Sequence, residues 1–278
     1  MIGKPAAKLL ILGYSYSCVH KSRVLQGKPF ISLDLSLQNV QKMMVMTLEK
    51  GDFILIDHVG RVKETGEVFD TTIEETAKEE KMYKEGEIYE PKLVVIGEGW
   101  VLKALDESLT TLEIGKTKKV EIPPEKGFGE RDPEKVRRVS LRQLRAKGIT
   151  PRIGMRLEYN GKMATLRTLG GGRALLDFNP PLAGKTLVYE VTVQENLETK
   201  KDKIAALIHR RIPAVEKSKF KFTAGTKTAK VKMPEEAFYL EGIQLAKRGI
   251  AMDIQRLIPN ITTVKFEEAF QKEATPQT

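Results

Sequence analysis

Two corners rich in glycine and proline constrain the fold of this chain more than any other feature. The first covers residues 123–129 and the second covers residues 179–184. Such corners mark turns, and a compact stretch between two of them indicates that one domain interrupts another. In the first corner Phe128 lies between two glycines, so its ring can point into a pocket without steric competition. We therefore expect an interrupted domain that presents an aromatic side chain at the first corner.

Length and composition indicate a folded protein with more than one domain. The chain has 278 residues, of which 41% are hydrophobic and 30% are charged, and this length allows about two or three small domains. Its single cysteine, Cys18, excludes an internal disulfide and indicates a reducing compartment. No apolar run approaches the ~20 residues that span a bilayer. We therefore predict a cytoplasmic protein without a membrane partner.

Residues that usually carry metal or nucleophile chemistry are sparse. The histidines, His20, His58 and His209, lie far apart in the sequence, and with a single cysteine they offer no recognisable zinc spacing. No Ser–His–Asp or Cys–His set stands out. We predict no metal ligands and no cofactor.

The net charge of +10 permits two interpretations. It favours attraction to acidic partners or RNA, or it reflects a well-solvated surface. The insert lacks obvious aromatic residues for base stacking beyond Tyr159. We therefore do not expect a nucleic-acid partner, although a basic module associated with ribosomes or nucleic acid stays open as an alternative. The basic residues behind that alternative are Arg137, Arg138, Arg142, Arg145, Lys147 and Arg152.

Residues 1–45 differ in character from the rest of the chain. Their short apolar piece ends at Gly13, whereas a signal peptide needs an unbroken apolar run of roughly 7–15 residues. Three methionines, the last of them Met46, cluster just before a domain pattern begins. We interpret residues 1–45 as a disordered lead or a start-site artefact, with the native start at Met46 or a neighbouring methionine.

Alternation of apolar and polar residues predicts the strands before the first corner. Residues 64–67 are predicted to form a turn, and residues 100–109 have the apolar spacing of a short amphipathic helix. The charged residues 73–84 indicate a solvated helix or loop. The predicted strands cover residues 53–62, 68–70, 92–96 and 116–122.

The insert is predicted to be a small antiparallel sheet with one helix. Ser140 can cap a helix over residues 141–147, which Gly148 ends. The pair Asn160 and Gly161 is typical of a type I′ hairpin turn. The predicted strands of the insert cover residues 155–159, 162–169 and 174–178.

The remainder is predicted to be an α+β domain that follows a charged linker over residues 199–203. Pro234 suits the first position of a helix over residues 234–258, and Pro259 ends that helix. This helix has a broad apolar stripe, which either packs on its own sheet or forms a homodimer contact. The stripe contains Phe238, Leu240, Ile243, Leu245, Ile250, Ile254 and Leu257. A further helix is predicted over residues 203–212, and strands over residues 219–222, 229–233 and 261–266.

Four pieces of sequence, in a fixed order, carry a family resemblance. They are residues 68–70 (VFD), 97–102 (GEGWVL), 123–129 (PPEKGFG) and 179–189 (NPPLAGKTLVY). The chain resembles FKBP-type peptidyl-prolyl cis-trans isomerases of the SlyD-like class, and as a whole it is similar to the long archaeal form. The resemblance implies an α+β fold in which an antiparallel half-barrel wraps a short helix.

The same resemblance implies a division into domains. An isomerase domain would cover residues 46–131 and 181–198, and an insert-in-flap domain would cover residues 132–180. The insert would be a small β-rich chaperone domain, and residues 203–278 would form the C-terminal α+β domain.

By resemblance, an apolar cleft would bind the proline of an X–Pro segment. Phe69, Phe128 and Tyr189 would form its aromatic walls. Asp70 would be the polar group near the twisted carbonyl, although an aspartate after a strand can also cap a turn. Val101, Leu102 and Leu105 would line the cleft, and they equally fit the core face of any helix.

Three positions depart from the family pattern. At the entry of the short helix, where Gly followed by Trp or Leu is usual, the chain has Ala104 and Leu105. His58 stands where the strand tyrosine is usual, and Phe128 stands where the loop tyrosine is usual, so a hydroxyl donor is lost. His58 either orients substrate or is a structural residue. Weaker catalysis is expected from these changes, so a holdase chaperone with little isomerase activity is the alternative function.

The apolar residues of the insert also have two interpretations. In the SlyD-like class this domain binds unfolded chains, and mobile Met and Leu surfaces suit such promiscuous recognition. Alternatively they form the insert's own core. We expect an isomerase that assists folding, with unfolded or nascent proline-containing polypeptides as partners and a homodimer through the C-terminal domain as an alternative assembly. The residues concerned are Met155, Leu157, Met163, Leu166 and Leu169.

Overall fold

The computed structural model describes residues 48–270. The predictions on residues 1–45, including the start at Met46, lie outside this range. Between residues 48 and 270, no helix combines the length and apolar character needed to cross a membrane.

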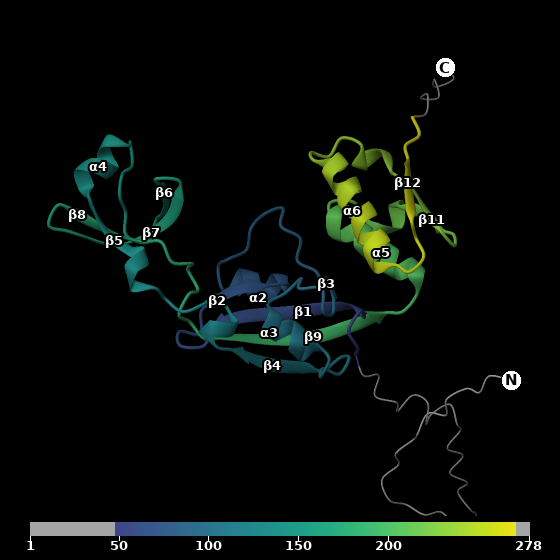
Figure 1. The fold of residues 1–278 in the computed structure, drawn as a ribbon, viewed down its shortest axis with the longest axis horizontal. Helices are drawn as coiled ribbons and strands as arrows, with labels where there is room; N and C mark the ends of the chain where they lie inside the picture. Colours follow the sequence, from purple (N-terminus) through teal and green to yellow (C-terminus); the bar gives the residue numbers. More distant parts are fainter. Residues whose placement is uncertain (1–47, 271–278) are drawn as a thin grey trace, which may run out of the picture. The chain divides into compact units, whose positions relative to one another are not determined.

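The first sheet joins strands from both sides of the insert (Figure 1). Its order is β2-β1-β9-β4, with β3 also paired to β1, and all its pairs are antiparallel. The long strand β9, which follows the insert in the sequence, lies between β1 and β4. The interrupted domain is therefore one continuous sheet. Its strands are β1 (Phe53–Val62), β2 (Val68–Thr71), β3 (Lys92–Val95), β4 (Thr117–Ile122) and β9 (Leu187–Leu197).

The short helix α3 (Lys103–Leu109) packs against this sheet (Figure 1). Leu105 and Leu109, one helical turn apart, are both buried in the core with Ile54 and Ile56 of β1. The apolar spacing predicted this contact, and the α+β fold with a short helix on an antiparallel sheet is confirmed. Only the helix α2 (Glu74–Glu79) forms in the charged stretch 73–84.

The insert is a four-stranded antiparallel sheet in the order β5-β8-β7-β6. Ser140 Oγ accepts a hydrogen bond from Arg142 N at the start of the helix α4, at 3.2 Å. Asn160 and Gly161 have φ values of 51° and 72°, as the hairpin turn requires. The cap and the turn are confirmed. The elements are β5 (Val136–Ser140), α4 (Leu141–Ala146), β6 (Arg156–Tyr159), β7 (Lys162–Gly170) and β8 (Arg173–Asp177).

The strand β5 was not predicted. Two consecutive arginines, Arg137 and Arg138, interrupt the alternation of apolar and polar residues there. It is an edge strand, paired only with β8 within the insert sheet, and edge strands often carry charged side chains.

The two chain segments that enter and leave the insert are tied together. Gly184 N donates to Gly129 O at 2.8 Å, which joins the two corners singled out in the sequence. Asp132 N donates to Asn179 Oδ1 at 2.9 Å, and Asn179 Nδ2 donates to Asp132 O at 2.8 Å. The corners are therefore neighbours in space, although about fifty residues separate them along the chain.

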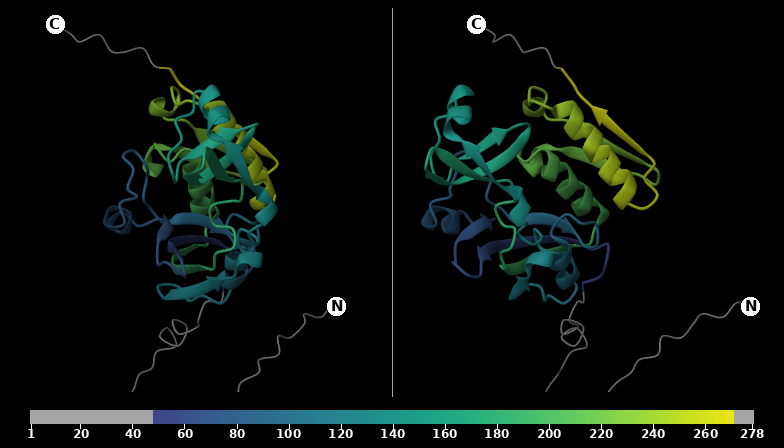
Figure 2. Two further views of the ribbon diagram at one scale, coloured as in Figure 1. Left: turned by 90° about the vertical axis from the view of Figure 1, so that its left-hand side faces the viewer. Right: turned by 60° about the vertical axis from the view of Figure 1, so that its left-hand side comes forward.

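The C-terminal residues form helices and a small sheet, in which α5 and α6 pack against one another and α6 contacts β12 (Figure 2). Phe53, Leu93 and Val95 of the first sheet belong to the same hydrophobic core. The sheet order is β10-β11-β12, with β11 and β12 parallel. The Arg211 guanidinium of α5 donates two hydrogen bonds to the Asp253 carboxylate of α6, at 3.0 and 2.8 Å. Gly249 has no side chain, which leaves space for the Arg211 guanidinium. The elements are α5 (Lys200–Arg211), β10 (Lys221–Ala224), β11 (Thr228–Lys232), α6 (Ile243–Leu257) and β12 (Thr263–Glu267).

Two predictions for the C-terminal part were wrong. Residues 199–203 are not a linker, because Thr199 Oγ1 accepts from Asp202 N and begins α5. The helix predicted over residues 234–258 is two elements, because Gly242 has a left-handed φ of 75°. Pro234 therefore precedes a 3₁₀ turn instead of opening a long helix. The 3₁₀ turns of the protein are Pro124–Lys126, Pro133–Lys135, Lys217–Lys219 and Glu235–Ala237.

The apolar stripe of the C-terminal part is divided between core and surface. Ile243, Ile250 and Ile254 are buried, and Phe238, Leu240 and Leu257 are half-buried against the same core. Leu245, in contrast, is 75% exposed. Most of the stripe therefore packs within the protein.

Candidate functional site

A hollow of about 890 Å³ lies where the first sheet meets the residues leading into α3. This volume is within the range of small-molecule and peptide side-chain pockets. Six of the eight predicted site residues line it. They are His58, Asp70, Val101, Leu102, Leu105 and Tyr189.

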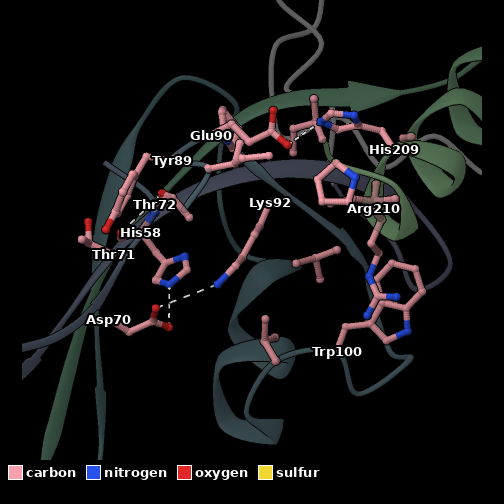
Figure 3. Close-up of a pocket in the computed structure, with 18 of the residues that line it drawn as sticks. His58, Asp70, Thr71, Thr72, Tyr89, Glu90, Lys92, Trp100, His209 and Arg210 are labelled. Carbon is pink, nitrogen blue, oxygen red and sulfur yellow. Dashed lines mark hydrogen bonds and ion pairs between the residues drawn. The ribbon is translucent and has the colours of Figure 1, made fainter. Parts of the chain in front are cut away.

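The polar centre of the hollow is a hydrogen-bonded pair from β1 and β2 (Figure 3). His58 Nε2 lies 2.9 Å from Asp70 Oδ2, and Lys92 Nζ lies 3.9 Å from the other carboxylate oxygen. The His58 side chain is 5% exposed, whereas that of Asp70 is 42% exposed. Asp70 therefore faces the open side of the hollow, and His58 supports it from within.

The pair determines the charge of Asp70. Burial alone would raise the pKa of the Asp70 carboxyl, but the hydrogen bond from His58 and the charges of His58 and Lys92 outweigh it. The net result is a lowered pKa, so Asp70 is a carboxylate at neutral pH. Burial, and then the charge of Asp70, raises the pKa of the Tyr189 phenol, so that Tyr189 stays neutral.

Two aromatic rings lie behind this pair. Tyr189 lines the hollow, whereas Phe69 packs against Tyr189 and is not among the lining residues. Tyr189 lies edge-on to Phe69, with ring centroids 5.6 Å apart, and its centroid is 5.8 Å from that of His58. Phe69 is half-buried and packs against the core of the first sheet. Both rings approach β1 at Gly60, where an added Cβ would lie 2.8 Å from Phe69 Cζ and 3.1 Å from Tyr189 Cε1. Gly60 is a site residue that sequence reasoning missed, although a glycine inside a strand signals a close approach.

The apolar rim comes from the segment that leads into α3. Val101 and Leu102 are half-buried at the hollow, and Leu105 is 2% exposed. The buried carboxylate of Asp106 accepts from Gly97 N with both oxygens, each at 3.0 Å. Since Gly97 has φ 87°, this contact holds the turn that places Val101 and Leu102.

The arrangement suits recognition of an apolar ring beside a polar amide group. It combines an aromatic wall, an aliphatic rim and the Asp70 carboxylate, with Glu87 and Glu90 also among the lining residues. Within residues 48–270, no group of three or more His, Cys, Asp or Glu side chains could hold a metal ion.

Comparison with known proteins establishes the family. A family model described as FKBP-type peptidyl-prolyl cis-trans isomerase matches residues 45–194, which is more than half of the chain. The chain belongs to this family. A second family model, described as FKBP26_C-terminal, matches residues 200–271 of the isomerase.

Named relatives agree with this assignment. The chain is 34% identical to the short-type peptidyl-prolyl cis-trans isomerase of Methanocaldococcus jannaschii over 152 residues, 55% of this chain and 96% of the relative. It is 32% identical to the SlyD isomerase of Treponema pallidum over 120 residues, 42% of this chain and 68% of the relative. SlyD of Helicobacter pylori is 28% identical over 125 residues, 43% of this chain and 66% of the relative. The protein is thus a SlyD-like FKBP-type peptidyl-prolyl cis-trans isomerase, and its likeness to the long archaeal form stays a prediction.

Phe128 of this FKBP-type isomerase does not lie where the resemblance implied. It is 41% exposed and is not among the residues that line the hollow. It follows a 3₁₀ turn in the corner that leads to the insert. Its role in substrate binding stays a prediction.

The far wall of the isomerase hollow comes from residues that were not predicted (Figure 3). His209 Nε2 lies 2.5 Å from Glu90 Oε1, and the Arg210 guanidinium lies 3.9 Å from the centre of the Trp100 ring. His209 and Arg210 belong to α5, more than a hundred residues after Glu90. These residues are far apart in the sequence and become neighbours only in the fold, so no local sequence pattern could have predicted that they line one hollow.

Proposed function

We propose that the hollow binds the proline ring of an X–Pro segment and accelerates its isomerisation in folding proteins. The observation that carries this proposal is the Asp70 carboxylate, held by His58, beside the apolar surface of Tyr189, Val101 and Leu102. A proline ring fits against the apolar surface, and the amide group that precedes it then lies near Asp70, whose carboxylate accepts hydrogen bonds only.

Isomerisation of an X–Pro bond requires only an apolar surface beside a polar group. Rotation about an X–Pro bond is opposed by amide resonance, with a barrier of about 18–20 kcal/mol for an ordinary peptide bond. The planar amide separates charge through resonance, and the twisted amide does so less. A water-poor apolar surface therefore destabilises the planar form more than the twisted form, which lowers the barrier.

In this proposal Asp70 binds the substrate through polar contact and His58 positions Asp70. His58 holds the carboxylate oriented and ionised by the hydrogen bond at 2.9 Å. Its Nδ1 is buried and has no hydrogen-bond partner among residues 48–270.

A Tyr189→Ala variant tests the site. We expect kcat/KM for a prolyl peptide to fall about 10- to 100-fold, because the variant loses an apolar contact worth about 1.5–3 kcal/mol. Tyr239→Ala is a matched control, because Tyr239 is 79% exposed and lies outside the hollow. Equal activity of the two variants would contradict the site. The same assay on Phe69→Ala and Phe128→Ala tests the two remaining aromatic assignments.

We further propose that the insert holds unfolded clients through its exposed apolar residues. Leu157 and Leu166 are buried in the insert's own core, so they are not available to clients. Met163 is 51% exposed and Ile153 is 67% exposed. These two side chains are therefore the client contacts that fit the flexible apolar recognition expected of such a domain.

Aggregation assays separate this activity from isomerisation. We expect Ile153→Ser with Met163→Ser to weaken suppression of aggregation of an unfolded client while turnover of a short prolyl peptide is unchanged. Met252→Ser is the control, because Met252 is 59% exposed on α6. Full suppression by the double variant would refute client binding at these residues.

A holdase with little isomerase activity is the second candidate. The observation that favours it is the replacement of two usual tyrosines by His58 and Phe128, together with the exposure of Phe128. It predicts suppressed aggregation with negligible turnover of prolyl peptides by the unmodified protein. Turnover that depends on Tyr189 would exclude it.

A further inference from the structure

Positive charge is concentrated in the insert. Residues 131–180 contain twelve Lys and Arg against four Asp and Glu, a net charge of +8, whereas the whole chain has +10. The acidic residues neutralise few of these cations. Asp177 pairs with Arg131 and Arg167, and Asp132 lies 3.7 Å from Lys135.

The remaining cations of the insert are exposed. Within the part of the chain that the structure describes, they make no ion pair within 4 Å. They are Arg137, Arg138, Arg142, Arg145, Lys147, Arg152, Arg156, Lys162 and Arg173. So many unpaired cations in a short segment repel one another, and this repulsion destabilises the folded insert. An anionic partner would reduce the repulsion.

The strand register places several of these arginines on one face of the sheet. Arg138 pairs with Leu175, and Arg173 pairs with Ser140 and Gly170. Residues directly opposite one another share a face, so Arg138 and Arg173 lie on the same side. The alternate residues Val139, Ala174 and Leu176 are buried with Leu144 of α4 on the other side. The arginine side is therefore the open face of the sheet.

Arg156 extends this open face to the opposite edge. It pairs with Thr165, whereas the next pair, Leu157 and Ala164, is buried in the core. Thr168 also lies on the open face, opposite Leu175. A surface hollow of about 490 Å³ lies at the glycine turn between β7 and β8. Arg138, Thr168, Arg173 and Leu175 of the open face line it, together with Leu169 and Ala174.

We propose that this open face of the insert binds the phosphate backbone of double-stranded RNA. Arginine guanidiniums and threonine hydroxyls are the groups that usually contact phosphates. Duplex RNA presents phosphates at every nucleotide, so it meets several arginines of one face at once. Duplex RNA is also recognised through shape and backbone contacts without base stacking.

The absence of aromatic side chains from this face favours a duplex over a single strand. Single strands are usually held by stacking of bases on aromatic rings. Tyr159 is the aromatic residue of strand β6, and its ring is half-buried on the core side with Lys147 4.6 Å from its centre. It is therefore not presented on the arginine face.

The face fits RNA better than an acidic polypeptide. Carboxylates occur irregularly along unfolded clients. The client contacts proposed above are apolar, and one of them, Met163, lies on this same face opposite Glu158. The proposal is also independent of the prolyl hollow, since none of its residues lines that hollow.

Fluorescence anisotropy with a labelled RNA duplex of about 20 base pairs tests this proposal on the full chain. We expect binding that weakens with salt, with a slope of log K against log salt of roughly −2 to −3 for about three phosphate contacts. Replacing Arg138 and Arg173 by Ala should lower the affinity at least tenfold and reduce the slope by about 2. The charge-preserving pair Arg138→Lys with Arg173→Lys should retain most of the affinity.

The matched control is Arg142→Ala with Arg145→Ala, which removes the same charge from exposed positions of α4. Equal weakening by both alanine pairs would overturn the proposal, because it would show diffuse attraction without a site on the open face. Tighter binding of single-stranded RNA or of a polyglutamate peptide than of the duplex would overturn it as well. Turnover of a prolyl peptide by each variant reports whether the fold is intact.

Discussion

At the scale of the residue, Gly60 determines whether the aromatic wall can form. A Cβ there would lie 2.8 Å from Phe69 Cζ and 3.1 Å from Tyr189 Cε1, closer than packed carbon atoms tolerate. The glycine therefore sets how near the two rings come to β1, and with that the position of Tyr189 at the hollow.

We predict that Gly60→Ala lowers both stability and activity. Overpacking of this kind costs about 1–3 kcal/mol, and displacement of Tyr189 should reduce turnover of a prolyl peptide severalfold. Urea denaturation and the peptide assay measure the two effects. Gly170→Ala is the control, because a Cβ at Gly170 would meet nothing within 4 Å. An active and stable Gly60→Ala protein would contradict the role assigned to Gly60.

His58 should determine the pH at which Asp70 loses its charge. The pKa of Asp70 in the folded protein is lowered. The stability that its carboxylate contributes is therefore present above the ordinary pKa of a carboxyl group, and it is lost as the pH falls through the lowered pKa. In His58→Phe the hydrogen bond and the nearby charge are removed, and burial then raises the pKa.

We therefore expect the acid limb of the pH profile of kcat/KM to move to higher pH in His58→Phe than in the unmodified protein. Circular dichroism at each pH separates this shift from acid unfolding. An acid limb at the same pH in both proteins would show that His58 does not position or ionise Asp70.

At the scale of the element, Asp177 at the end of β8 organises the base of the insert. Burial opposes its charge, but hydrogen bonds from Asn179, Arg131 and Arg167 outweigh burial and lower the pKa of Asp177 to about 2. Its contribution to stability is present above the unfolded pKa near 4 and is lost as pH falls toward about 2. A shift of this size corresponds to roughly 2 kcal/mol.

We predict that Asp177→Asn destabilises the insert by roughly 2 kcal/mol at neutral pH and by less near pH 2. Thermal melting at pH 7 and pH 2.5 measures the difference. Glu158→Gln is the control, because Glu158 is exposed on β6. Identical melting of the aspartate variant and the unmodified protein at pH 7 would refute the organising role.

Elements were predicted well where the signal is local. The Asn160–Gly161 turn and the Ser140 cap depend on residues within one turn of the chain, and both are present. The strand β5 and the start of α5 at Thr199 were missed. Both segments are rich in charged residues, which are also typical of loops and linkers. An edge strand and a solvated helix end tolerate such residues, so the sequence pattern did not reveal them.

For the molecule as a whole, two exposed apolar side chains of α6 bear on the predicted homodimer. Leu245 and Met252 are 75% and 59% exposed, and their spacing of seven residues places them on one side of the helix. A homodimer through the C-terminal domain stays a prediction, and these two side chains are its proposed contact.

We expect Leu245→Glu with Met252→Glu to convert a dimer to a monomer in sedimentation velocity, because a two-fold contact doubles every introduced charge. The control Ile153→Glu with Met163→Glu places the same charges on exposed apolar positions of the insert. A monomeric unmodified protein would refute this contact directly.

Most elements and the family motifs could be predicted from the sequence, because each depends on residues that are near neighbours along the chain, whereas β5 and the start of α5 could not. The sequence also placed His58, Asp70, Tyr189 and the residues before α3 together through their resemblance to one family. Three features became evident only from the fold: Gly60 leaves room for two rings, α5 contributes to the wall of the hollow, and Phe69 and Phe128 are not among its lining residues. The fold likewise decided that the insert's arginines share one face. These features depend on strand register and on contacts across a hundred residues, and no local pattern encodes them.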